Sequence, residues 1–327
     1  MPTALVTGAS GCVGSSLALR LAAIGYNLRI LRRSSSDLRY LGTISRKEFV
    51  GDICDDDTLR RAMEGCDIVF HTAALVSFAR KTEDEQRRVN VLGTRAVVGA
   101  CLASGVKTLV HTSSVTTIGH ASPGEAADEA SPADHSHARG YRLSKVLAED
   151  EVWNGTGLGL HAVIVNPSVI IGERDTRFHA GQLIRDIKKG RIPFYIDGGM
   201  NVTYVGDVVS GMLLAAAKGR RAERYILGGE NLSHREIFLR TSDLIGGRRP
   251  RARLPLPVLR GIGRIVESGS RLLGIEPALT ADLAAVAGHY NWFSSAKAVR
   301  ELGYTMTPFD QAILAAYAWY KENGYVL

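Results

Sequence analysis

The sequence predicts an α/β fold, with a doubly wound parallel sheet and a smaller, mostly helical C-terminal lobe. Two patterns lead to this prediction. Up to about residue 170, short apolar runs alternate with amphipathic segments, which is typical of strands and helices in a parallel sheet. Beyond that point the alternation weakens, and glycine, proline and arginine interrupt shorter helical stretches. A chain of 327 residues has the length for one large domain and a lobe of this kind.

The first predicted strand, residues 3–7, leads directly into a glycine-rich turn. Gly8, Gly11 and Gly14 follow at a spacing of three, and a helical apolar stripe then begins at Leu17. In a strand–turn–helix unit of the Rossmann type, the first glycine permits the tight turn, the second lets a pyrophosphate approach the backbone, and the third lets the helix pack against the strand. The phosphates would lie at the helix N-terminus. A glycine turn without a ligand stays open as the alternative, since the spacing differs from G-x-G-x-x-G.

The remaining elements follow from the same periodicities. Strands are expected at residues 27–31, 47–50, 67–71, 107–112, 161–166, 202–205 and 225–227, and helices at 11–25, 55–63, 84–104, 138–156, 182–189, 207–218 and 307–322. The continuous apolar runs indicate strands that are buried on both faces. We therefore assign residues 1–171 to a dinucleotide-binding domain, to which 201–227 and 305–327 return, and residues 172–200 and 228–304 to a substrate lobe.

Composition and charge limit the partners. The net charge is +7, and seven arginines lie between Arg248 and Arg271 without interleaved aromatic residues. We therefore expect no nucleic-acid partner, whereas peripheral contact with an anionic membrane stays open. No apolar run reaches 18 residues, so no integral membrane segment is expected, and a first strand at residue 3 leaves no room for a signal peptide. The four cysteines lack metal-ligand spacing, and we expect a reduced, cytoplasmic protein without a metal.

The residues after the second strand bear on the choice of cofactor. An acidic residue there would accept hydrogen bonds from the adenosine ribose of NAD, but this chain has Arg32 and Arg33, followed by three serines. A carboxylate would repel a 2′-phosphate, whereas guanidinium groups bind one. The pattern favours NADP(H) over NAD(H), which stays open. The alternative is that both arginines are solvated turn residues. Asp52, after the third strand, could receive the adenine amino group.

Three further strand ends carry small or polar residues. Ala73 and Ala74 close the fourth strand and would let a cofactor lie close to the backbone, while the adjacent His71 is expected to be structural. A serine hydroxyl ends the fifth strand at Ser114, where ligands of open α/β sheets bind. Pro167 ends the sixth strand and could turn the backbone toward a nicotinamide amide.

Tyr141 and Lys145 provide a partner for Ser114. Residues four apart share one face of a helix, so an ammonium would lie near the phenol and lower a pKa that starts near 10. Such a phenol is a usable general acid or base for a carbonyl–alcohol pair, and the serine could polarise the same oxygen. A second match to this spacing, Tyr317 and Lys321, lies in a terminal amphipathic helix with no upstream serine, and we interpret it as packing.

Taken together, these motifs resemble the extended short-chain dehydrogenase/reductase superfamily over essentially the whole chain. Within it, the chain is most similar to the dihydroflavonol-reductase-like, 3β-hydroxysteroid-dehydrogenase-like and hopanoid-associated sugar-epimerase-like group. The resemblance rests on an ordered set of motifs: residues 7–14, 67–74 and 90–94, the serine strand, Tyr141 with Lys145, and residues 204–207, 225–231, 293–298 and 302–304.

The resemblance implies roles for individual residues. Tyr141 would donate the proton, Lys145 would bind the nicotinamide ribose, and Ser114 would hold the substrate oxygen, with Ser113 as the fallback if the register differs by one. The other implied positions are Asn90 near the active-site helix; Gly8, Gly11, Cys12, Val13 and Gly14 around the pyrophosphate; Asp52 and Ile53 at the adenine; and Pro167 and Ile170 at the nicotinamide. A homodimer through helices 84–104 and 138–156 is also implied.

We therefore expect an NAD(P)H-dependent oxidoreductase that interconverts a ketone and a secondary alcohol on a small molecule. One alternative is an NAD-dependent nucleotide-sugar epimerase or dehydratase. Another is a non-catalytic NADP-sensing regulator, although such proteins typically lack the tyrosine and lysine. The apolar stripe at Leu259, Ile262, Ile265 and Val266 could line a lipophilic pocket or be ordinary helix packing.

Overall fold

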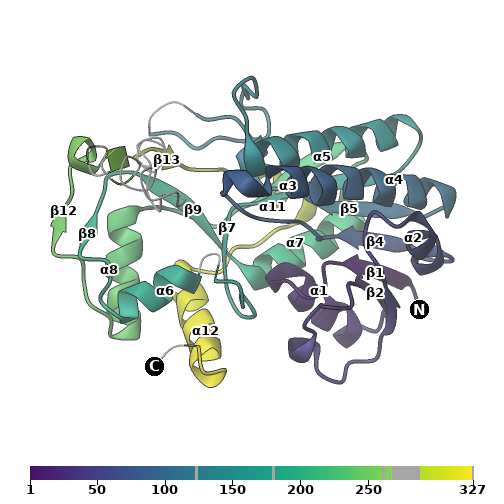
Figure 1. Cartoon of the computed structure of the whole chain (residues 1–327), viewed down its shortest axis with the longest axis horizontal. Helices are drawn as coiled ribbons and strands as arrows, with labels where there is room; N and C mark the ends of the chain where they lie inside the picture. Colours follow the sequence, from purple (N-terminus) through teal and green to yellow (C-terminus); the bar gives the residue numbers. More distant parts are fainter. Residues whose placement is uncertain are drawn as a thin grey trace.

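The computed structural model describes residues 1–121, 124–178, 181–259, 261, 263–264, 266 and 288–325. Its main feature is a seven-stranded sheet in the order β10-β6-β5-β4-β1-β2-β3, in which every neighbouring pair is parallel (Figure 1). The strands are β1 (Thr3–Thr7), β2 (Asn27–Arg32), β3 (Lys47–Val50), β4 (Ile68–His71), β5 (Thr108–Thr112), β6 (Ala162–Pro167) and β10 (Glu223–Leu227). The strand order reverses at β1, which confirms the predicted doubly wound sheet.

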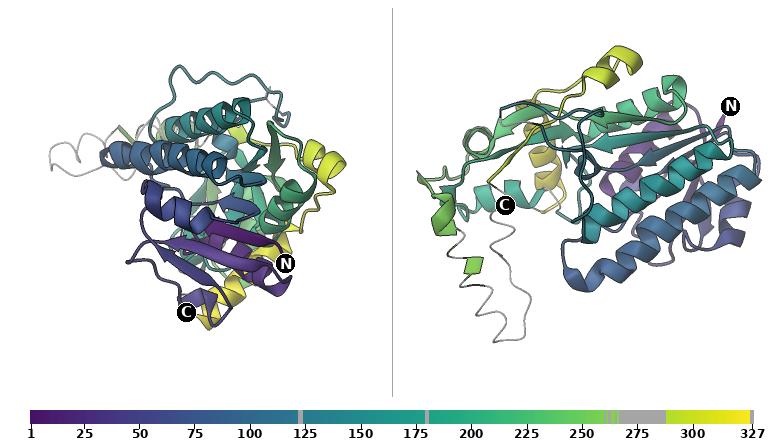
Figure 2. Two further views of the ribbon diagram at one scale, coloured as in Figure 1. Left: turned by 90° about the vertical axis from the view of Figure 1, so that its right-hand side faces the viewer. Right: turned by 90° about the horizontal axis from the view of Figure 1, so that it is seen from above.

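Helices cover both faces of this sheet (Figure 2). The helices of one face are α1 (Cys12–Ala23), α7 (Val205–Lys218) and α11 (Ala296–Leu302), which share one buried apolar cluster. The helices of the other face are α2 (Asp56–Met63), α4 (Gly93–Ala103) and α5 (Gly140–Gly157). Apart from α11, which precedes α12, each of these helices lies between two strands in the chain, as the crossovers of a parallel sheet require.

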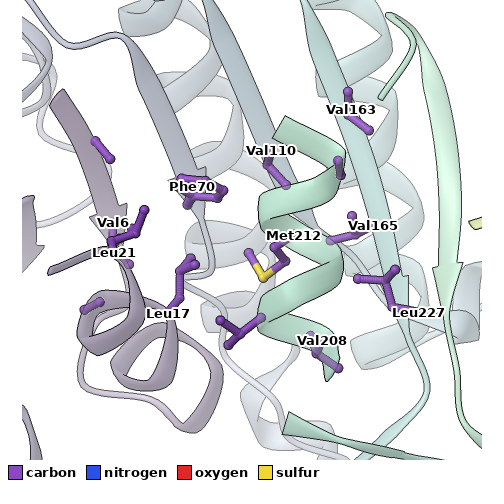
Figure 3. Close-up of a cluster of buried hydrophobic side chains, with 14 of the residues drawn as sticks. Val6, Leu17, Leu21, Phe70, Val110, Val163, Val165, Val208, Met212 and Leu227 are labelled. Atoms are coloured by element: carbon purple, nitrogen blue, oxygen red, sulfur yellow. The ribbon is translucent and has the colours of Figure 1, made fainter. Parts of the chain in front are cut away.

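The strands alternate their side chains between the two apolar clusters. In β1, Val6 joins the α1–α7 cluster while Leu5 joins the opposite one. Figure 3 shows Val208 and Met212 of α7 in one buried apolar cluster with Val110 of β5. Full burial of each such side chain stabilises the fold by roughly 1.5–3 kcal/mol. This packing holds the carboxyl ends of the strands, where the site lies, in fixed positions.

The glycine turn between β1 and α1 requires two of its glycines. Gly8 has a φ of 78°, in the left-handed region that side chains disfavour. A Cβ on Gly14 would lie 2.2 Å from the carbonyl oxygen of Gly8, so a larger residue would push the helix away from the strand. The predicted roles of the first and third glycines therefore agree with the local geometry.

A second layer of structure lies beside the main sheet (Figure 1). Its strands are β7 (Val169–Ile171), β9 (Gly199–Tyr204), β11 (Glu230–Ser233) and β13 (Tyr290–Asn291), and a separate pair is formed by β8 (Phe194–Tyr195) and β12 (Ala252–Arg253). Its helices are α6 (Gly181–Lys188), α8 (His234–Ile245) and α12 (Phe309–Glu322). We call this layer, with its own buried apolar cluster, the small lobe.

Three segments pack differently from the sequence-based assignment. The last helix, α12, was expected to return to the main body, but its buried face packs with α6 and α8 in the small lobe. Strand β9, expected in the main body, pairs with β7 and β11. Conversely, α11, expected in the substrate lobe, packs on α7 and β10. Amphipathic elements of this kind carry an apolar face but no signal that selects between two apolar surfaces.

Several other expectations concern the surface and the charged groups. None of the described helices has the length and apolarity needed to cross a membrane. Within the described ranges, no group of three or more His, Cys, Asp or Glu is placed to hold a metal. In the arginine-rich stretch, Arg249 pairs with Asp243 and Arg253 pairs with Asp197. Arg260, Arg271, Ile262 and Ile265 lie outside the described residues.

Candidate active site

The structure brings Ser114, Tyr141 and Lys145 together at the carboxyl end of β5, and we call these three candidate catalytic residues the catalytic cluster. Helix α5 presents Tyr141 and Lys145 one turn apart. The Tyr141 phenol lies beside the Ser114 side chain, which acts to lower the phenol's pKa. The Lys145 ammonium is buried and donates a hydrogen bond of 2.7 Å to the carbonyl oxygen of Thr112. The three polar groups therefore converge where strand β5 ends.

Local contacts distinguish Ser114 from Ser113 as the serine that lies beside Tyr141. Ser114 caps the short 3₁₀ turn Val115–Thr117 by accepting a hydrogen bond from the Thr116 amide, and Asn166 donates to its carbonyl oxygen. Ser113 is buried, and its hydroxyl has no hydrogen-bond partner among the described residues. Ser114 rather than Ser113 contacts Tyr141.

The expected lowering of the Tyr141 pKa is not met. Burial raises the pKa of Tyr141 to about 12, and the hydrogen bond with Ser114 only partly opposes this effect. The ammonium of Lys145 is directed at the Thr112 carbonyl instead. Burial also lowers the pKa of Lys145 to about 8, against the opposing effect of the Glu149 carboxylate. At neutral pH the phenol is therefore protonated, which suits a proton donor, and the lysine is mostly charged.

Glu149 is a buried carboxylate one further turn along α5, and sequence reasoning missed it. It accepts hydrogen bonds from the Thr117 hydroxyl at 2.7 Å and the Asn166 amide at 2.8 Å, and Arg224 lies 3.5 Å away. These contacts join α5 to the ends of β5 and β6. The available signal was its spacing, since an acid four residues after Lys145 must share the same helix face.

Asn90 lies in a π-helical turn, Arg87–Leu92, that interrupts the single helix expected at 84–104. The turn separates α3 (Glu83–Gln86) from α4. The Asn90 side chain accepts from the Leu75 amide and donates to the Leu75 carbonyl and the Ser144 hydroxyl. Ser144 in turn donates to the Tyr141 carbonyl oxygen. Asn90 therefore contacts the active-site helix, as expected, through the Ser144 hydroxyl, which in turn bonds to the Tyr141 backbone.

His71 occupies the structural position that the sequence predicts. Its ring nitrogens lie 2.8 Å from the Thr7 hydroxyl and 3.0 Å from the Thr94 hydroxyl. Burial, with a smaller effect of Lys145, lowers the pKa of His71 to about 3. The ring is therefore neutral and serves to connect β1, β4 and α4.

A cavity of about 300 Å³, which we call the cofactor cavity, lies at the carboxyl ends of β1 to β4. Because these strands are parallel with β5, the cavity and the catalytic cluster lie at the same edge of the sheet. The predicted cofactor residues that line it are Gly8, Gly11, Arg32, Arg33, Asp52, Ile53, Ala73 and Ala74. Lining residues that sequence reasoning missed include Ser10, Ser36 and Arg177.

The cavity fits the phosphates of a dinucleotide. A Cβ on Gly11 would meet only the Gly8 carbonyl oxygen, at 3.5 Å, so this glycine leaves space rather than filling a packing requirement. Helix α1 begins next to it without an acidic residue in its first turn and, within the described residues, without a side-chain cap. Its first amide groups are thus available to anions.

The charged residues of the cavity are not equivalent. Arg32 forms an ion pair with Glu48 at 2.6 Å, whereas the Arg33 side chain has no hydrogen bond or ion pair among the described residues. Asp52 pairs with Arg88 at 3.1 Å. Burial opposes ionisation of Asp52, but hydrogen bonds from Arg88 and from the Cys54 amide outweigh it and lower its pKa. Arg33 is the better placed of the two predicted arginines to bind a further phosphate.

The other predicted cofactor residues lie outside the cavity lining. The Cys12 thiol donates to the Glu173 carbonyl oxygen at 3.3 Å, and burial raises its pKa. Val13 packs against the α1–α7 apolar cluster. Gly14 lies under Gly8. Further along the same edge, Pro167 ends β6 and Ile170 lies in β7.

Comparison with known proteins places the chain in a family. The sequence model of the 3-beta hydroxysteroid dehydrogenase/isomerase family matches residues 5–230. The chain is 35% identical to "Putative dihydroflavonol 4-reductase" of Synechocystis sp., over 98% of this chain and 95% of that protein. It is 34% identical to 4-hydroxy-2-methyl-3-oxo-4-farnesyl-3,4-dihydroquinoline-1-oxide ketoreductase of Stigmatella aurantiaca, over 91% of this chain and 90% of that protein.

Solved structures agree with this assignment. The crystal structure of gox2253 has a TM-score of 0.90 and 37% identity, and the match covers 100% of both chains. A nucleoside-diphosphate-sugar epimerase from Pseudomonas aeruginosa has a TM-score of 0.81 and 25% identity, and the match covers 100% of this chain and 99% of that chain. The chain therefore belongs to the 3-beta hydroxysteroid dehydrogenase/isomerase family of extended short-chain dehydrogenases/reductases, and it is an NAD(P)-dependent oxidoreductase.

Proposed function

We propose that this chain is an NADPH-dependent reductase that interconverts a ketone and a secondary alcohol, with Tyr141 as the general acid or base. The observation that carries the proposal is the placement of Ser114 beside Tyr141, with Lys145 on the same helix, at the sheet edge that also holds the cofactor cavity. In the overall reaction, a ketone, NADPH and a proton give the alcohol and NADP⁺. The bound cofactor supplies the hydride.

Each residue of the catalytic cluster has one task in this proposal. Ser114 donates a hydrogen bond to the substrate oxygen and holds it beside the phenol. Tyr141, protonated at neutral pH, gives its proton to that oxygen as negative charge develops there. Lys145 contributes positive charge one helical turn away, which stabilises the phenolate that proton donation leaves behind. Asn90 and Glu149 keep α5 in place.

The preference for NADPH rests on Arg33. Its guanidinium lines the cavity without an ion-pair partner among the described residues, beside Ser36 and the end of β2. A 2′-phosphate would form charge-assisted hydrogen bonds with such a group, and NADH offers no equivalent anion. We therefore expect NADPH to bind more tightly than NADH.

A lipophilic ketone is the proposed substrate class. Phe78 is 85% exposed, and its ring centroid lies 6.1 Å from that of Tyr141 in an edge-to-face arrangement. An exposed aromatic ring beside the proton donor gives the substrate an apolar surface to contact. The name of the Stigmatella relative describes reduction of a farnesylated ketone, which supports the same class.

The test is a set of turnover assays with purified protein. Lipophilic and polar ketones would be supplied with NADPH or NADH, and nicotinamide oxidation would be followed by absorbance. The proposal predicts that NADPH is oxidised only when a ketone is present, and that lipophilic ketones are preferred. Absence of oxidation with every ketone would contradict it.

A nucleotide-sugar epimerase is the second candidate, because one of the solved structures with a similar fold is such an enzyme. An epimerase that uses NAD catalytically would keep the cofactor through purification and show no net redox change. Arg33, which has no ion pair among the described residues, argues against this candidate, since NAD carries no 2′-phosphate for it to bind. Analysis of the nucleotide released on denaturation, together with an epimerisation assay on nucleotide sugars, separates the two functions.

A further inference from the structure

The turn that connects β7 to α6 crosses the N-terminal end of α1. The carbonyl oxygen of Glu173 accepts the hydrogen bond from Cys12, the first residue of that helix. One residue later, Arg174 donates to the Ser16 hydroxyl at 3.1 Å. Residues 172–178 therefore lie over the helix end that offers its amide groups to a pyrophosphate.

This turn is held in an unusual backbone conformation. Arg174 and Phe178 have φ values of 64° and 53°, in a region that residues other than glycine rarely adopt. Contacts fix both ends: Tyr204 donates to the Glu173 carboxylate at 2.8 Å, and Phe178 stacks on Tyr320. Strain that the surrounding structure maintains is characteristic of functional segments.

Arg177 lies between these two fixed points and lines the cofactor cavity together with Ser10 and Gly11. It is exposed, and its side chain has no hydrogen bond or ion pair within the part of the chain that the structure describes. The acidic residues of the cavity, Asp52 and Glu85, have Arg88 as their shared ion-pair partner and, within the described ranges, form no ion pair with Arg177. The guanidinium of Arg177 is therefore free to bind an anion in the cavity.

We propose that Arg177 is a cofactor-binding residue, whose guanidinium binds the pyrophosphate of the dinucleotide from the side opposite the glycine turn. The contacts of its turn with Cys12 and Ser16 favour the pyrophosphate over the 2′-phosphate. The latter would lie near Arg33 and Ser36, after β2. The inference rests on the proposed function only in taking the same cavity as the cofactor site.

The test compares binding of NADPH and NADH to four proteins by titration calorimetry. Because NADPH and NADH both contain the pyrophosphate, Arg177→Ala should weaken both by the same factor, roughly tenfold or more. Arg177→Lys should retain part of the affinity, since a lysine keeps the charge but not the paired donors. Arg20→Ala is the matched control: it removes an exposed arginine from the opposite end of α1 and should change neither affinity.

A second ligand separates direct contact from a structural effect. Displacement by 2′-AMP, which has no pyrophosphate, should be unchanged in Arg177→Ala and weakened in Arg33→Ala. Unchanged affinity of Arg177→Ala for both cofactors would overturn the inference, as would a loss confined to NADPH or a matching loss for 2′-AMP. If the unmodified protein bound neither cofactor, the proposed function would fail as well.

Discussion

The cofactor cavity and the catalytic cluster lie at one edge of the same sheet, but they are built differently. The cavity is formed by turn backbone, glycines and partly exposed arginines, and its cations have room to accept a ligand. The catalytic cluster is formed by a buried lysine bonded to the backbone and by a partly buried serine and tyrosine that lie beside each other. The first arrangement suits binding and the second suits a proton transfer. Substitutions in the two regions should therefore change different kinetic quantities.

The largest expected effect comes from removing the proton donor. Tyr141→Phe should lower kcat for ketone reduction by roughly 10³-fold, because the ring stays packed but the transferable proton is lost. The dissociation constant for NADPH should change by less than about twofold. Tyr317→Phe, in the other tyrosine–lysine pair, is the control and should leave kcat unchanged. Steady-state kinetics and cofactor titration on both variants check this prediction.

Ser114→Ala should have the next largest effect. Loss of the hydroxyl that holds the substrate oxygen should lower kcat by roughly a hundredfold without changing NADPH binding. Ser113→Ala offers a matched comparison, since its hydroxyl has no partner among the described residues and its removal should cost little activity. Equal losses in the two variants would mean that the serine roles are assigned wrongly.

Substitution of the cavity arginines should change cofactor binding without changing turnover. Arg33→Ala should weaken NADPH binding by about tenfold, leave NADH binding unchanged, and preserve kcat at saturating NADPH. Arg32→Ala should have a smaller effect on the NADPH-to-NADH ratio, because Arg32 is committed to Glu48. Titration of both cofactors into both variants measures this. A larger loss of selectivity in Arg32→Ala would reverse the assignment.

The pH dependence of reduction should report on Lys145. Its pKa of about 8 lies below the ordinary lysine value because of burial, so the ammonium is present at pH 7 and is lost as the pH rises through 8. We expect kcat to fall by at most about tenfold between pH 7 and pH 9. Glu149→Gln removes the carboxylate that raises this pKa and should move the fall to lower pH. A kcat that stays constant to pH 9.5 would show that the charge of Lys145 is not needed.

The sheet and the motif residues could be predicted because their signals are local. Apolar runs, glycine spacing and the separation of Tyr141 from Lys145 are properties of a few neighbouring residues. The direction of the Tyr141 pKa shift could not be predicted, since burial raises this pKa and the lysine ammonium is directed at the Thr112 carbonyl. The pairing of Arg32 with Glu48 joins neighbouring strands. The position of Arg177 depends on a turn whose Glu173 contacts Cys12 of α1 across 161 residues of sequence. Likewise, no local sequence pattern predicts that α12 packs in the small lobe rather than on the main sheet.

The most direct test measures cofactor affinity and turnover in one experiment for two variants, Tyr141→Phe and Arg33→Ala. NADPH dissociation constants and kcat at saturating NADPH would be determined with the same ketone. The account predicts that Tyr141→Phe loses turnover and keeps its affinity for NADPH, and that Arg33→Ala loses affinity and keeps turnover. Loss of both quantities in both variants, in similar proportion, would contradict the separation of binding from proton transfer.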